Sequence, residues 1–172
     1  TGWLEFPFKK GLKKPDFSWD VHADLRDVVT DKLIPGRLLT ATQLTLRSTQ
    51  ADVAVKGQAR LDDVPMTGSW RLSLLDKGEP SVLLAQVPVG PDTAKKLGMK
   101  RPDGMFSGAA VGALRVEIDG KSPPQFALTS DLEGLSARID PLGFRFGAAE
   151  SGRLAVSGSF SNPVKVTSLS ID

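Results

Sequence analysis

Residues 17–25 read FSWDVHADL, with an apolar side chain at every odd position and a polar one at every even position. Successive side chains of a β-strand point to opposite faces, so this alternation predicts a strand with one apolar and one polar face. The same period recurs in residues 52–61 and 64–74, where Gly57, Gly68 and Trp70 keep to the apolar phase. The period of a strand therefore dominates this sequence.

The rest of the chain repeats this pattern between turn-forming residues. Asp62-Asp63 and residues 119–124 (DGKSPP) are typical of turns. One short helix is predicted near 92–98, where Asp92-Thr93 precedes an alanine and Gly98 ends it. Residues 27–34 are ambiguous. Further strands are predicted at 38–47, 81–87, 106–118, 125–132, 135–139, 142–146, 153–160 and 163–171.

The composition excludes most kinds of reactive site. The 172 residues contain no cysteine and one histidine, His22, which lies on the polar phase of its strand and is expected at the surface. Disulfide frameworks, zinc fingers and thiol nucleophiles are therefore excluded, and no catalytic, metal-binding or cofactor-binding residue is predicted. A formal net charge of +2 is too small for a dedicated nucleic-acid binder.

The length suits one domain, and we interpret residues 1–172 as a single β-rich segment of a larger protein. An echo within it predicts an internal repeat of about 17–61 and 124–160. Residues 19–25 (WDVHADL) align with 126–132 (FALTSDL), and VAVKG at 53–57 aligns with LAVSG at 154–158. Such a repeat implies units that stack along one axis.

The apolar strand faces need a cover. One helix of roughly 10 Å cannot shield so many strands. Two architectures remain: a closed β-sandwich or barrel, or a curled antiparallel sheet whose open groove is partly filled by an apolar ligand. Patterning alone does not separate them, because a core and a groove show the same alternation.

Basic residues gather in two places. Residues 9–14 (KKGLKK) are the densest run, and Lys95, Lys96, Lys100 and Arg101 surround the predicted helix. Either group forms a solvated surface or contacts an anionic surface such as lipid headgroups.

Five short motifs carry a resemblance to a known family: residues 57–65 (GQARLDDVP), 70–72 (WRL), 94–99 (AKKLGM), 131–135 (DLEGL) and 142–144 (LGF). Together they resemble the large AsmA-like proteins of Gram-negative bacteria, and most closely the YhdP-type branch with its repeating β-groove units. The similarity covers roughly residues 17–160. Met99 and Phe144 depart from the family pattern but keep its apolar character.

This resemblance implies a function. Such proteins are anchored in the inner membrane and extend through the periplasm as a curled sheet, whose apolar groove carries phospholipid toward the outer membrane. It implies phospholipid acyl chains and envelope proteins as partners, a membrane anchor outside this segment, and no catalytic residue. The alternative is a non-catalytic β-sandwich module that docks or scaffolds a protein partner.

A lining for the groove follows from the strand phases, because acyl chains would lie on the in-phase apolar side chains. The predicted lining residues are Trp19, Val21, Leu25, Leu44, Leu46, Val53, Val55, Leu61, Trp70, Leu72, Leu74, Leu114, Val116, Ile118, Leu128, Leu132, Leu154 and Val156.

Overall fold

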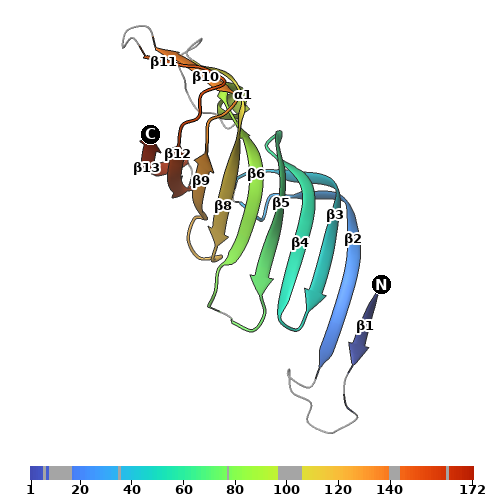
Figure 1. Cartoon of the computed structure of the whole chain (residues 1–172). Coiled ribbons are helices and arrows are strands. Elements are labelled where there is room, and N and C mark those ends of the chain that lie inside the picture. Colours follow the sequence, from blue (N-terminus) through green and yellow to red (C-terminus); the bar gives the residue numbers. More distant parts are fainter. Residues whose placement is uncertain are drawn as a thin grey trace.

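The computed structural model describes residues 1–5, 7, 17–34, 36–76, 78–96, 106–139, 144–161 and 163–172. These residues form a ten-stranded antiparallel sheet and a separate three-stranded sheet. The large sheet runs from an edge at β1 to an edge at β13 without closing into a barrel, and it is strongly curled (Figure 1). The prediction of a mainly β, open and curled sheet is confirmed.

The large sheet contains, in spatial order, β1 (Gly2–Glu5), β2 (Ser18–Thr30), β3 (Leu39–Thr49), β4 (Asp52–Leu61), β5 (Val64–Ser73), β6 (Ser81–Val89), β8 (Ala110–Ile118), β9 (Gln125–Ser130), β12 (Leu154–Ser159) and β13 (Lys165–Ile171). The small sheet contains β11 (Phe144–Phe146), β10 (Leu135–Ile139) and β7 (Phe106–Gly108). The helix α1 (Pro91–Lys96) follows β6.

The elements differ from the sequence prediction in two places. The short strand β1 was not expected, and the single strand predicted at 106–118 is divided into β7 and β8. Gly108 makes this break because its φ of 80° suits glycine, and a side chain there would collide with the Gly134 carbonyl oxygen. The predicted helix end at Gly98, the basic residues 9–14, Lys100 and Arg101, and the start of the strand at 142 lie outside the described residues.

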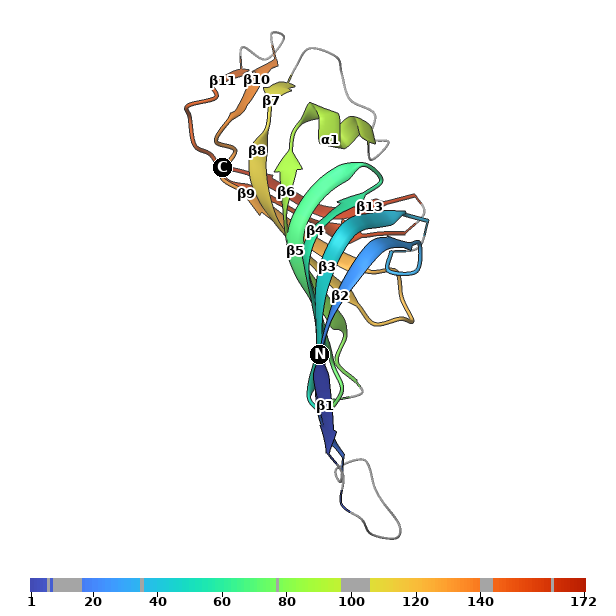
Figure 2. The same cartoon turned by 90° about the vertical axis from the view of Figure 1, so that its right-hand side faces the viewer.

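The curl of the sheet begins at irregularities in β2 and β3. In β2 the half-buried positions change from Ala23 and Leu25 to Val28, because Asp27 takes a left-handed φ of 50°. The register between β3 and β4 shifts by one residue between Thr40 and Leu44. Bulges of this kind bend and twist strands, and Figure 2 shows β2 and β3 bending away from β6 and β8. The change of phase explains why residues 27–34 were ambiguous in the sequence.

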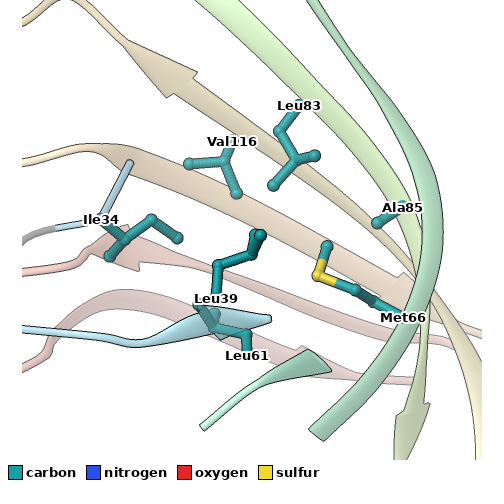
Figure 3. Packing of buried hydrophobic residues seen from close by; sticks show 7 residues of the cluster. All are labelled: Ile34, Leu39, Leu61, Met66, Leu83, Ala85 and Val116. Carbon is teal, nitrogen blue, oxygen red and sulfur yellow. The ribbon is translucent and has the colours of Figure 1, made fainter. Parts of the chain in front are cut away.

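The bent strands cover part of their own sheet. Leu39 and Met66 come from the ends of β3 and β5 near the β4–β5 turn, yet they pack in one cluster with Leu83 and Val116 from the opposite ends of β6 and β8 (Figure 3). Ile34, from the connection between β2 and β3, enters the same cluster and is 1% exposed. The main core is therefore made by the curl of one sheet and one inserted connection.

A second, smaller core lies beside the three-stranded sheet. Ala110, Leu132, Leu135 and Leu154 form it, and Phe146 of β11 packs against it. The three-stranded sheet thus covers the end of the large sheet where β8 begins and β9 ends.

The β4–β5 turn is fixed to the start of β3. Asp62 and Asp63 both have positive φ, 47° and 68°, as the predicted tight turn requires. The Asp62 carboxylate accepts hydrogen bonds from Arg37 at 2.7 Å and from the Leu38 backbone N–H at 2.9 Å. Partial burial raises the pKa of Asp62, but these hydrogen bonds outweigh it and hold that pKa below its ordinary value.

This arrangement predicts a pH-dependent contribution to stability. A carboxylate with a lowered folded-state pKa stabilises the fold above its ordinary pKa of about 3.9 and loses that effect as pH falls through the folded value. Asp62→Asn keeps a residue that tolerates positive φ but removes the charge. We expect it to cost about 1–2 kcal/mol at pH 7 and much less near pH 3. Urea unfolding of both proteins at the two pH values tests this, and an equal cost at both would contradict it.

Both edges of the large sheet are exposed. Every residue of β1 and β13 is exposed, including Trp3 at 54% and Leu169 at 63%. Apolar side chains on unpaired edge strands are unusual, because such edges invite further strands.

Candidate functional site: an apolar inner face

The strand register joins the apolar phases into continuous rows. Residues directly opposite each other in an antiparallel pair share one face of the sheet. The first row crosses nine strands through Ala23, Leu46, Val55, Trp70, Leu83, Val116, Phe126, Gly158 and Val166. The second row lies beside it and contains Leu25, Leu44, Gly57, Gly68, Ala85, Leu114, Leu128, Val156 and Leu169.

These two rows define the inner face, and every member is apolar or glycine. They run across the strands rather than along them, so the track that they make spans nine of the ten strands of the sheet. Nine of the eighteen predicted lining residues belong to the rows: Leu25, Leu44, Leu46, Val55, Trp70, Leu114, Val116, Leu128 and Val156.

Seven further predicted residues occupy the same face at other positions of the strands: Trp19, Val21, Val53, Leu61, Leu72, Ile118 and Leu154. The other two lie just beyond strand ends. Leu74 follows β5 and is 38% exposed, and Leu132 follows β9 with a positive φ of 62° and is 6% exposed. Whether any of the eighteen touches lipid stays a prediction.

Much of the inner face is sealed by the protein itself. Val116 is 0% exposed and Leu61 is 6% exposed, and both lie in the main core. Leu132 and Leu154 are buried in the second core, against which Val156 packs. These predicted lining residues hold the fold together in the structure described here.

One open part of the inner face, besides the exposed edge strand β13, lies where β2 and β4 begin and β3 and β5 end. Its apolar side chains belong to neither core cluster, and Val21 is 39% exposed. The residues of this open part are Trp19, Val21, Leu46, Val53, Val55 and Leu72. All six were predicted from the strand phase.

An apolar pocket of about 340 Å³ lies between this open part and the main core. Leu25, Leu44, Val55 and Trp70 line it on the inner face, and Leu33 of the β2–β3 connection lines it as well. The cross-strand pair Gly57 and Gly68 also lines it.

Several inner-face residues were missed at the sequence level. Leu83 and Ala85 of β6 complete the two rows, and Ile34 seals the core. The run SVLLAQV at 81–87 has apolar side chains in both phases, which obscures the face, although Gln86 marks the polar phase. Ile34 lies in a connection, where strand periodicity gives no signal.

A larger cavity of about 850 Å³ opens where β5 and β6 separate. The two strands pair only from Thr67 to Arg71, and Pro65 and Pro88 stand on the separated parts. Proline has no backbone N–H, so it cannot complete a ladder there. Gln58, Gln86 and Arg60 give this cavity a mixed polar lining. It therefore suits an apolar chain less well than the smaller pocket.

The charged groups lie on the outer phase of the strands. Asp20 pairs with Arg47 at 2.8 Å and with His22 at 3.0 Å, and His22 is exposed as predicted. The hydrogen bonds from Arg47 lower the pKa of Asp20. Arg71 pairs with Asp52 at 2.7 Å on the same side. The sheet thus presents one face of ion pairs and one apolar face.

The described residues hold no cluster of three or more His, Cys, Asp or Glu side chains able to bind a metal ion. In the same part of the chain, no helix has the length and apolar character that crossing a membrane requires. Comparisons of the chain with protein-family models, curated proteins and solved structures yield no match.

Proposed function

We propose that this chain is a segment of a bridge-like protein of the periplasm that carries phospholipid along an apolar β-groove between the inner and outer membranes. The full-length protein would be tethered to the inner membrane outside this segment. The observation that carries the proposal is the open apolar part of the inner face together with the apolar pocket beside it. Both belong to a face whose two apolar rows cross nine strands without a polar side chain.

A physical argument supports it. Each methylene group that is transferred out of water contributes about 0.8 kcal/mol of binding free energy. An acyl chain that lies on the open part of the inner face therefore removes its own methylenes and the partly exposed apolar side chains from water. The ion pairs of the outer phase stay in water. The groove then needs no catalytic group and no cofactor, which agrees with the resemblance to the AsmA-like family.

Native mass spectrometry of the purified chain tests the proposal. We expect co-purifying phospholipid, with masses that report which lipids are bound. Val55→Asp places a charge on the pocket wall and is expected to reduce phospholipid binding at least about tenfold, because burying an unpaired carboxylate beside an acyl chain is costly.

Ala54→Asp is the matched control. Ala54 is the neighbouring residue of β4, is half-buried like Val55, and lies opposite Arg47 and Arg71 on the outer phase. We expect its phospholipid binding to equal that of the parent chain. A parent chain free of lipid, or equal binding by the two variants, would refute the proposal.

The second candidate is a docking module, and the fully exposed edge strand β13 favours it. Its backbone has a partner on one side only, β12. A module of this kind would show a clean mass without lipid in the same experiment and would bind a partner through strand addition.

A further inference from the structure

The strongest unexplained feature of the inner face is the indole of Trp70. Among the described residues, its Nε1 is the one buried side-chain nitrogen or oxygen atom that has no hydrogen-bond partner. Buried polar groups are nearly always paired, so a donor left alone in an apolar wall calls for an explanation. Trp70 also lines the 340 Å³ pocket.

Trp19 shows what a satisfied indole looks like on the same face. Its Nε1 donates a hydrogen bond to the Ser48 Oγ at 3.1 Å. Ser48 lies one strand away, on the inner phase of β3. The residues opposite Trp70 are Val55 and Leu83, and neither side chain can accept a hydrogen bond. The sequence thus supplies an acceptor to one tryptophan and apolar neighbours to the other.

We infer that the pocket takes one acyl chain of a phospholipid and that the ester carbonyl oxygen of that chain accepts a hydrogen bond from Trp70 Nε1. The inference rests on the proposed function and adds the chemical group that the site recognises. The volume lies at the low end of the roughly 300–1,000 Å³ typical of ligand sites, which suits a single chain.

The surroundings favour a neutral acceptor. Of the sixteen lining residues, only Lys32 and Lys56 are charged. Lys56 lies on the outer phase of β4. The Lys32 side chain is 87% exposed and pairs with Asp31 at 3.1 Å. A free carboxylate would bring a charge into this wall without a buried cation to pair with it. An ester carbonyl brings the acceptor without the charge.

Part of the pocket lining lies in a turn and not in a strand. Lys32 and Leu33 belong to the turn after β2 and line the pocket. Because Trp70 Nε1 is buried, an entering acyl chain reaches it by displacing apolar side chains. Among the lining residues, those of this turn are the ones that no strand pairing holds in place.

A comparison of two ligands tests the inference directly. Dioctanoyl phosphatidylcholine and its di-O-octyl ether analogue differ in the ester carbonyl groups, and both are used below their micelle concentrations in calorimetric titrations of the 172-residue chain. We expect the parent chain to bind the ester about 3- to 10-fold more tightly, the gain of one hydrogen bond.

Trp70→Phe keeps an aromatic ring and removes the N–H, so it should bind the ester and ether equally. Trp19→Phe, the matched control, should keep the preference for the ester. Persistence of the preference in Trp70→Phe, or tighter binding of octanoate than of the ester, would overturn the inference.

The two proposals fail in different ways. Equal binding of ester and ether by the parent chain overturns the role of Trp70 and leaves lipid carriage standing, whereas binding of neither ligand overturns both. Thermal unfolding of each variant accompanies the titrations. If Trp70→Phe does not fold, the ester–ether comparison on the parent chain decides the question alone.

Discussion

Val116→Asp is expected to unfold the protein or to destabilise it by about 3–5 kcal/mol, a large part of the stability of an ordinary domain. Val116 is 0% exposed and lies at the centre of the main core, between Leu83 and Phe126 in the first row. An aspartate there has no cation beside it, so its charge must be neutralised or the core must open.

Val111→Asp is the matched control on the same strand. Val111 is 62% exposed, and surface changes of this kind usually stay within about 0.5 kcal/mol. Urea unfolding followed by far-ultraviolet circular dichroism measures both variants. Similar midpoints for Val116→Asp and the parent chain would show that this position is open, as its place in the predicted groove lining implies, rather than sealed.

Gly68→Val is expected to cost about 3 kcal/mol, although valine favours strands far more than glycine does. A Cβ on Gly68 would collide with the Leu84 carbonyl oxygen and lie 2.8 Å from the Ala85 Cα. Both atoms belong to the backbone of β6, so no side-chain rotation relieves the contact. The pairing of β5 with β6 must give way instead.

Thr67→Val provides the comparison for this result. Thr67 precedes Gly68 in β5 and is exposed on the other face, so the same valine meets no backbone there. We expect its unfolding free energy to change by less than about 0.5 kcal/mol. Equal stability of the two variants in urea unfolding would mean that β5 and β6 are not packed as closely as described.

The sequence was sufficient to predict most of the strands, and the apolar face of those whose alternation is clear. In residues 17–25 and 52–61 the alternation leaves no doubt about which side chains share a face, because the period of a strand is two. The open sheet was chosen over a closed sandwich only with the help of the family resemblance. The structure confirms the open, curled sheet.

Three features were beyond the reach of periodicity. Asp27 reverses the phase of β2 because its backbone adopts a positive φ. The presence of an aspartate in the sequence does not predict this conformation. Ile34 fills the core from a connection. Which in-phase residues are sealed, such as Val116, and which are open, such as Val55, depends on the curl of the whole sheet. Alternation identifies a face but does not identify what covers it.

The alternation of ten antiparallel strands makes β1 and β13 run in opposite directions. At about 4.8 Å between neighbouring strands, the apolar track, which crosses the nine strands from β2 to β13, measures roughly 38 Å along the sheet. Its length is therefore counted in strands and not in residues per strand. Duplicating one hairpin adds two strands and would lengthen the track by roughly 10 Å. The two edge strands would still run in opposite directions, so a sheet of this kind can grow by whole hairpins without any change to its edges.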